Sequence, residues 1–190
     1  MNTNIDTIQK EIDSLFGKYS IPAITKNLPM ENLHIWSSKV AKHFILDEAE
    51  FQQVVAELFW SMAHVQLSLG HTLLALQECA FPDGTQGIAL HEDEVPTAVN
   101  MPEIYFWHHA YNTYECIYRC WERINNVIKH VCIKGIPEKE FKKKYLPQTM
   151  DYLEKDPKYL KNTYFVNLKN QLPNRKEAAD IRNEISHGKS

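Results

Sequence analysis

Hydrophobic residues along this chain recur every three or four positions, which is the spacing of an α-helix, whereas the alternation typical of strands is nearly absent. A first helix is predicted near the N-terminus, with Gly17 as its stop. Its apolar positions are Ile5, Ile8, Ile12 and Leu15. A shorter helix is predicted over residues 31–44. Its apolar side consists of Leu33, Trp36, Val40 and Phe44.

Two much longer helices are predicted in the middle of the chain. The first starts at Asp47, where Glu50 completes a pattern resembling a capping box, and continues to residue 80, a length of about 50 Å. Residues 81–101 are polar and without a period, which predicts a long loop. The second long helix starts near Pro102, a residue suited to a first helical position, and runs to residue 134. Two such helices pack as an antiparallel hairpin.

Helical wheels predict which sides of the two long helices are buried. The first apolar stripe is Val54, Leu58, Met62, Val65, Leu69 and Leu76. The second is Phe106, Ala110, Tyr114, Ile117, Trp121, Ile124 and Ile128. A polar stripe is predicted to face solvent, with a subunit interface or metal ligation as the alternatives, and it contains Glu57, His64, His71 and Glu78. An aromatic set at helical spacing is predicted to lie in the core rather than to stack on bases: Trp107, Tyr111, Tyr114, Tyr118 and Trp121. His108 and His109 are predicted to be surface residues.

The last third of the chain predicts shorter helices. A lysine-rich helix over 137–145 ends before Pro147, and a second helix opens at Asp156 and runs to about residue 171. Asn174 with Glu177 forms a capping box that opens the last helix, and Gly188 is its stop. The core side of that helix is Ala178, Ile181 and Ile185.

The predicted fold is all-α, an antiparallel helical bundle built on two long helices with shorter flanking helices. Its length suits a single domain over 1–190, with N-terminal helices in 1–44, the long hairpin in 47–134 and basic helices in 136–190. No secretory signal or membrane-spanning stretch is recognised, which predicts a cytoplasmic protein without a membrane partner. The four cysteines lack a C-x-x-C pair and are predicted to be reduced and buried: Cys79, Cys116, Cys120 and Cys132.

The charge distribution is uneven, although the net charge of −3 argues against a general nucleic-acid binder. Residues 134–190 hold 13 Lys/Arg against 8 Asp/Glu, whereas the rest of the chain holds 8 against 16. A basic surface would concentrate a polyanion such as RNA. The other interpretation is that the lysines of 139–144 are simply the solvated face of a helix.

The basic third ends in the sequence Arg182-Asn183-Glu184-Ile185-Ser186-His187. This sequence resembles the R-x4-6-H motif of HEPN domains, which are all-α proteins, many of them metal-independent ribonucleases. The resemblance implies a homodimer that brings two copies of the motif together across a two-fold axis. The long helices and the R-N-x-x-x-H form are most similar to a bacterial branch of the family rather than to its compact toxins. Most HEPN ribonucleases continue as helix beyond the motif, whereas only three residues follow it here.

The residue types of the motif suit cleavage of RNA by attack of the 2′-hydroxyl on the adjacent phosphate. The resemblance implies that His187 is the acid/base, Arg182 the phosphate clamp and Asn183 a supporting residue. On a regular helix Arg182 and His187 lie about 140° apart, whereas Asn183 and His187 share a face. The site is therefore completed by a second subunit or by unwinding of the helix end, and the resemblance implies the first.

The expected function is that of a metal-independent endoribonuclease of toxin–antitoxin or phage-defence type. The expected partners are RNA, a second copy of the chain and a nucleotidyltransferase-like antitoxin, and no cofactor or metal is expected. An alternative is a catalytically inactive HEPN module that binds a nucleotide or scaffolds a nucleotidyltransferase-like partner. A further alternative is a di-iron bundle, because Glu31-x-x-His34 and Glu184-x-x-His187 are both present. The glutamates that remain for such a site lie on the wrong side of the long helices: Glu57, Glu115 and Glu122.

Overall fold

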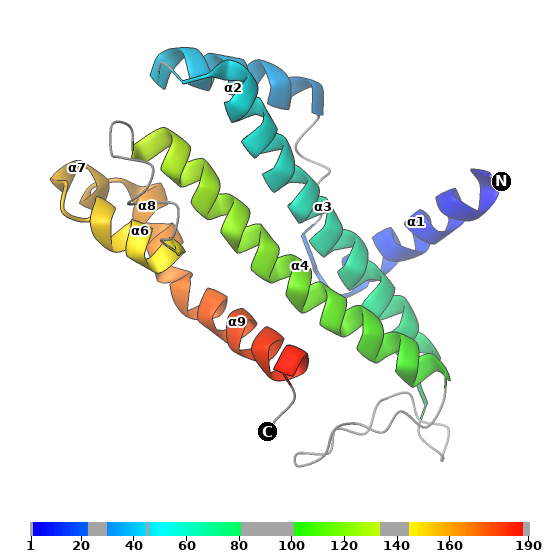
Figure 1. The fold of residues 1–190 in the computed structure, drawn as a ribbon. Coiled ribbons are helices and arrows are strands. Elements are labelled where there is room, and N and C mark those ends of the chain that lie inside the picture. Colours follow the sequence, from blue (N-terminus) through cyan, green and yellow to red (C-terminus); the bar gives the residue numbers. More distant parts are fainter. Residues whose placement is uncertain (1, 23–29, 45, 81–100, 134–144, 188–190) are drawn as a thin grey trace. The chain divides into compact units, whose positions relative to one another are not determined.

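The computed structural model describes the backbone of residues 2–22, 30–44, 46–80, 101–133 and 145–187. It describes the side chains of the same residues except 2–5, 30–31 and 185–187. The helical elements in Figure 1 are α1 (Asn2–Lys18), α2 (Met30–Phe44), α3 (Glu48–Glu78), α4 (Met101–Cys132), α6 (Leu146–Leu153), α7 (Pro157–Leu160), α8 (Thr163–Asn170) and α9 (Leu172–His187). The predicted all-α helical bundle is confirmed. Among the described helices, none combines the length and the apolarity that crossing a bilayer requires.

The chain divides into two compact units. Unit 1 consists of Met1–Asn27 and Ala63–Cys116, and unit 2 consists of Leu28–Met62 and Ile117–Ser190. The division falls within α3 and within α4, so each long helix contributes one part to each unit. The single-domain organisation stays a prediction.

In unit 1, α1 packs closely against α3. Ile12 and Leu15 are buried, as their spacing predicts. A Cβ atom added to Gly70 of α3 would lie only 2.6 Å from Ile12 Cγ2, so this approach needs a residue without a side chain. The helix ends one residue beyond the predicted stop at Gly17, and Ser20 takes a left-handed conformation with φ 54° just after it.

The contact between α3 and α4 in unit 1 is made by buried hydroxyl groups. Thr113 Oγ1 lies 2.8 Å from the His109 carbonyl oxygen, 3.1 Å from Ser68 Oγ and 3.2 Å from Thr72 Oγ1. Ser68 Oγ also donates to the His109 carbonyl across the helix pair at 3.3 Å. Short side chains such as these let two helices approach closely. The six residues of the predicted apolar stripe on α3 are half-buried, and Ser68 and Thr72, which lie beside that stripe on the helical wheel, are the fully buried ones here.

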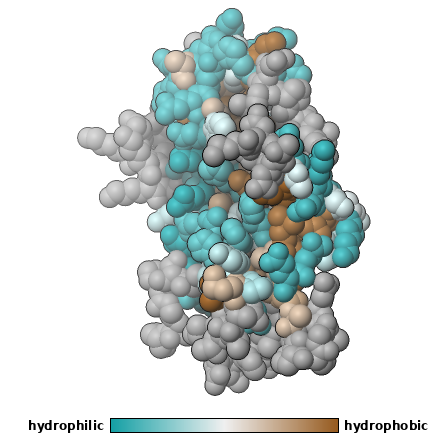
Figure 2. All heavy atoms as spheres, turned by 90° about the vertical axis from the view of Figure 1, so that its right-hand side faces the viewer, coloured by the Kyte–Doolittle hydropathy of each residue, from teal (hydrophilic) through white to brown (hydrophobic). Residues whose placement is uncertain are grey.

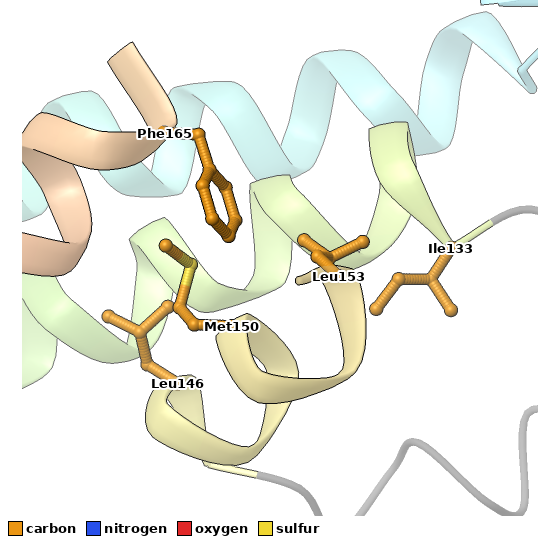
Figure 3. Packing of buried hydrophobic residues seen from close by; sticks show 5 residues of the cluster. All are labelled: Ile133, Leu146, Met150, Leu153 and Phe165. Atoms are coloured by element: carbon orange, nitrogen blue, oxygen red, sulfur yellow. The ribbon is translucent and has the colours of Figure 1, made fainter. Parts of the chain in front are cut away.

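In unit 2, the end of α4 and the helices α6 and α8 share an apolar core (Figure 3). Its buried members are Ile133, Leu146, Met150, Leu153 and Phe165. Trp121 from α4 and Leu172 from α9 pack against this cluster. Each such side chain contributes about 1.5–3 kcal/mol by leaving water, so the cluster fixes the short helices on α4.

Helix α6 is absent from the sequence prediction, which ended the preceding helix before Pro147. Pro147 instead lies in the first turn of α6, where a missing N–H leaves no hydrogen bond unmade. The Tyr145 N–H donates to Gln148 Oε1 at 3.1 Å and so caps the start. The predicted lysine-rich helix over 137–145 lies outside the described residues except for Tyr145, and so does the predicted loop except for residue 101.

The helix predicted from Asp156 to about residue 171 is in fact two helices. Asp156 caps α7 as predicted, accepting the Lys158 N–H at 3.0 Å. Asn162 then caps α8, accepting the Phe165 N–H at 3.1 Å, which divides the predicted helix. The predicted capping box at Asn174 is also wrong, because α9 starts at Leu172 and the Asn174 side chain donates to Gln171 Oε1 at 2.6 Å.

The predicted apolar side of α2 is confirmed in part. Leu33 and Val40 pack on the cluster that contains Ala41 and Phe51, whereas Trp36 and Phe44 are 49% and 41% exposed. On the face drawn in Figure 2, hydrophobic residues gather in a patch among hydrophilic ones. Single exposed apolar side chains are ordinary on protein surfaces and indicate no function by themselves.

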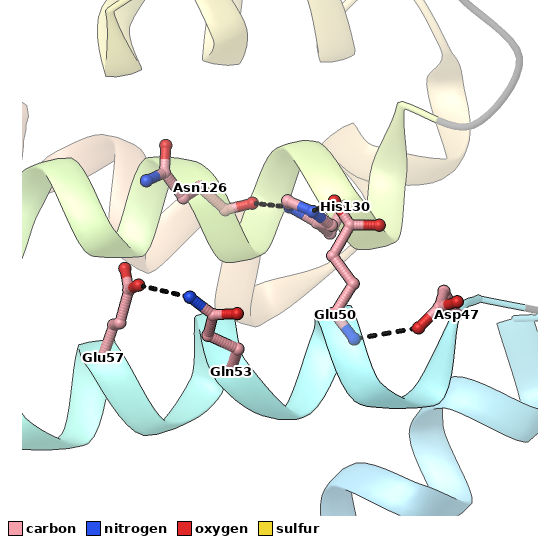
Figure 4. Close-up of polar contacts among 6 residues, drawn as sticks. All are labelled: Asp47, Glu50, Gln53, Glu57, Asn126 and His130. Atoms are coloured by element: carbon pink, nitrogen blue, oxygen red, sulfur yellow. Dashed lines mark hydrogen bonds and ion pairs between the residues drawn. The ribbon is translucent and has the colours of Figure 1, made fainter.

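The predicted solvent-facing stripe of α3 is wrong at two positions, because it contacts α4 there. In unit 2, Glu57 pairs with Arg123 at 2.7 Å, and Glu50 lies 3.2 Å from His130 Nε2. Figure 4 shows Glu50 and Glu57 on α3 together with His130 on α4. In unit 1, the His71 ring stacks on the His109 ring with 5.1 Å between centroids. Within unit 2 the partners' numbers rise on α3 as they fall on α4, which confirms the predicted antiparallel pairing.

Candidate active site

The motif lies on the last helix, α9, and the packing of α9 on unit 2 determines its position. Leu172 of α9 packs on the core of unit 2, and Ala178 is 5% exposed. Ala178 was predicted as a core position and is confirmed, Ile181 is half-buried, and the Ile185 side chain lies outside the described ones. Positions 172, 175, 178 and 182 recur at helical spacing, so one side of α9 faces the rest of unit 2.

Two of the three predicted catalytic residues are in contact. Arg182 Nη1 donates to Asn183 Oδ1 at 3.2 Å. Arg182 is half-buried, with its guanidinium carbon 5.0 Å from the centre of the Tyr118 ring on α4, whereas Asn183 is exposed. The amide therefore helps to orient the guanidinium from the solvent side.

The position of His187 follows from the backbone of α9. The helix runs through His187, so the alternative of an unwound helix end is wrong. Position 187 lies one turn beyond Asn183 and about 140° around the helix from Arg182. The His187 side chain lies outside the described ones, and its part in a joint site stays a prediction.

Two residues near the motif were not predicted from the sequence. The guanidinium carbon of Arg175 lies 5.9 Å from the centre of the Tyr118 ring, the same ring that Arg182 contacts. Arg175 precedes Arg182 by seven positions, a spacing that places both on one face and could have been noticed. Tyr118 could not be found in this way, because its role depends on how α9 packs on α4.

The predicted aromatic core set needs a correction at the same point. None of its five members is buried among the described residues, and all five are half-buried. Trp121 packs on the apolar cluster of unit 2, but Tyr118 is covered by two arginines. The cysteine prediction needs a similar correction, since none of the four cysteines, all within the described residues, forms a disulfide, but only Cys79 is fully buried.

Burial and the neighbouring Glu122 carboxylate favour the neutral phenol of Tyr118. Burial raises the pKa of Tyr118, as do the charge of Glu122 and a hydrogen bond with Glu122, while Arg175 and Arg182 act in the opposite direction. Burial also lowers the pKa of the nearby Lys129, an effect that Glu122 opposes. The charged neighbours of Tyr118 are thus two guanidinium groups and the one carboxylate of Glu122.

The positive charge of the last third is not spread evenly. Residues 145–187 hold 7 Lys/Arg against 6 Asp/Glu, so most of the surplus falls in residues 134–144 and at Lys189, outside the described part. Several described lysines are paired locally, such as Lys158 with Asp156 at 3.0 Å. The choice between a polyanion-binding surface and a solvated helix face stays open.

A separate pocket of about 320 Å³ lies between the end of α4 and the helices α6 and α7. Cys132, Lys155 and Tyr159 are among its lining residues, and none of them belongs to the motif. Burial raises the pKa of the Cys132 thiol, so it is not activated as a nucleophile.

The described residues contain no group of three His, Cys, Asp or Glu placed as metal ligands would be. His34 and Glu184 are exposed, and the side chains of Glu31 and His187 lie outside the described ones, so the di-iron alternative has no ligand set in this part. Comparisons of the chain with protein-family models, with curated proteins and with solved structures find no match.

Proposed function

We propose that this chain is a metal-independent endoribonuclease of the HEPN type, acting as a dimer in a toxin–antitoxin or phage-defence system. The observation that carries the proposal is the contact between Arg182 and Asn183 on a helix that continues to His187. The all-α fold agrees with the family resemblance. The system type, the cytoplasmic location and a nucleotidyltransferase-like antitoxin follow from that resemblance and from the composition.

The proposed chemistry uses one permanent charge and one group that titrates near neutrality. Arg182 stabilises the charge that develops on the phosphoryl oxygens when the 2′-hydroxyl attacks, and Asn183 holds the guanidinium in place. His187 transfers the proton. A 2′,3′-cyclic phosphate and a free 5′-hydroxyl are the products that such an attack leaves.

A second subunit is part of the proposal because of the helix geometry. Arg182 is directed toward α4, and position 187 lies about 140° around α9 from it. A two-fold axis would allow His187 of one chain to meet Arg182 of the other. Symmetric pairs are also the commonest oligomers.

The test is cleavage of structured RNA in EDTA by the wild type and by His187→Ala. We expect the wild type to cut and His187→Ala to lose activity about 10²–10⁴-fold, with an unchanged melting temperature. His34→Ala is the matched control, because His34 is an exposed histidine of the other Glu-x-x-His sequence. A wild type that does not cut RNA would contradict the proposal. Cutting by the wild type that occurs without EDTA but stops in its presence would favour a metal site instead. Loss of cutting in both His187→Ala and His34→Ala would also favour a metal site.

One observation favours the alternative of a catalytically inactive module. The Arg182 guanidinium makes a cation–π contact with the Tyr118 ring, and such a contact can serve to fix α9 on α4. Such a module would bind a nucleotide or scaffold a nucleotidyltransferase-like partner without cutting RNA. Nucleotide binding by a wild type that leaves every RNA intact is the result expected for this alternative.

A further inference from the structure

We propose that Arg175 is a second RNA-phosphate contact beside Arg182, and that Tyr118 is a positioning residue that holds both guanidinium groups. This inference rests on the proposed function and extends its site from the motif to the face where α9 meets α4. The ligand class is the phosphodiester backbone of single-stranded RNA.

The first support is the shared ring. Because the guanidinium carbons of Arg182 and Arg175 lie 5.0 Å and 5.9 Å from the centre of one ring, they are at most about 11 Å apart. Stacking fixes the plane of a guanidinium while leaving its edge for hydrogen bonds. Two oriented donors within this distance suit neighbouring phosphates of one strand.

The second support is that Arg175 lacks a hydrogen-bond partner for its Nε and an ion-pair partner among the described residues. Its Nε is buried and has no hydrogen-bond partner among the described residues. Arg175 also makes no ion pair with a residue that the structure describes, unlike Arg123, which pairs with Glu57. No described carboxylate is therefore in direct contact with the Arg175 guanidinium. A phosphate would supply such a contact through the outer nitrogens.

The third support is the way that Tyr118 is held. Its hydroxyl hydrogen-bonds with Glu122, four positions later on α4, which limits movement of the ring. Two arginines against one carboxylate leave this cluster positive. The two arginines contact the ring and not the hydroxyl group, so a positioning role predicts that loss of the ring weakens RNA binding more than loss of the hydroxyl.

The experiment measures binding of a 2′-O-methyl RNA oligonucleotide, which cannot be cleaved, over a range of salt concentrations. Removing one phosphate contact lowers the slope of log affinity against log salt by about 0.7 for a single strand. We expect this change in Arg175→Gln, together with binding weakened about tenfold. The matched control is Lys176→Gln, since Lys176 is the adjacent exposed residue with the same charge.

The Tyr118 variants separate positioning from packing. Tyr118→Leu is expected to lower the salt slope, whereas Tyr118→Phe, which keeps the ring, is expected to bind like the wild type. If Tyr118→Leu lowers only the melting temperature, or if Arg175→Gln and Lys176→Gln change the slope equally, the inference is overturned. Cleavage of unmodified RNA is measured in parallel. A wild type that cuts RNA while Arg175→Gln binds normally overturns this inference alone, and a wild type that neither binds nor cuts overturns the proposed function as well.

Discussion

Each of the two units contains a polar cluster at its segment of α4. The clusters differ in whether their polar groups find hydrogen-bond partners within the cluster. In unit 1, the hydroxyls of Ser68, Thr72 and Thr113 bond to one another and to the His109 carbonyl. In unit 2, the Tyr118 ring contacts the guanidinium groups of two arginines. The Nε of one of them, Arg175, has no hydrogen-bond partner among the described residues. The first cluster is neutral and closed, whereas the second is charged and retains donors.

This difference separates a structural cluster from one that can take a ligand. Buried hydroxyls that bond to each other add stability and leave nothing for a substrate. A guanidinium that contacts an aromatic ring through its face can still donate hydrogen bonds from its edge to a phosphate. Substitutions in the unit 1 cluster should therefore change stability alone, and substitutions in the unit 2 cluster should change activity.

The largest expected effect concerns the unit 2 cluster and the subunit that completes it. Arg182→Ala and His187→Ala should each lose activity about 10²–10⁴-fold while unfolding like the wild type. Mixing the two variants should restore about a quarter of the wild-type activity. The reason is that half of the dimers are then mixed and one of their two sites is intact. Initial rates of RNA cleavage after co-refolding measure this recovery. No recovery although mixed dimers form would place the site within one chain.

A smaller effect is expected in unit 1. Thr113→Val removes a buried hydroxyl that lies within hydrogen-bonding distance of Ser68, Thr72 and the His109 carbonyl. We expect the free energy of unfolding to fall by about 1–3 kcal/mol, measured by urea denaturation, with RNA cleavage unchanged. Thr113→Ser keeps the hydroxyl and is the control. A loss of cleavage without a loss of stability would contradict the comparison.

The smallest effect is the response of unit 1 to acid. Burial lowers the pKa of His109, and the neighbouring rings of His71 and His108 lower it further. The unfolded chain therefore binds a proton more readily than the folded one. The contribution of the neutral ring is complete above the unfolded pKa of about 6.5 and is lost as pH falls through the lower folded pKa. Thermal unfolding between pH 7 and pH 5 should show a steeper loss in the wild type than in His109→Gln. Equal slopes would exclude this coupling, and His43→Gln controls for an exposed histidine.

The long helices were predictable because their signals are local. Caps and apolar periodicity predicted helices over 47–80 and 102–134, and the structure has Glu48–Glu78 and Met101–Cys132. The full extent of the side that α3 buries was not predictable, because apolar residues occur on most sides of that helix and the wheel angle is poorly fixed. Glu57 and His71 consequently contact α4 instead of facing solvent alone.

Helix α6 and the residues around the motif show where a sequence signal is insufficient. Pro147 is compatible with a helix break and with a first helical turn, and the burial of Leu146 and Met150 favours the second. Arg182 and Asn183 are adjacent in sequence, so their contact was within reach of prediction. The place of Tyr118 beside them depends on tertiary packing between residues more than fifty positions apart.

Gly70 limits how this protein can be engineered. Replacing a mid-helix glycine with alanine is a common way to gain about 1 kcal/mol of helix propensity. Here the added methyl group would occupy the space of Ile12 Cγ2. A larger residue such as valine at position 70 would act as a wedge that releases α1 from α3 without altering the sequence of α1. Such a variant would show what the N-terminal helix contributes to the stability of the protein, while the sequence of the motif stays unchanged.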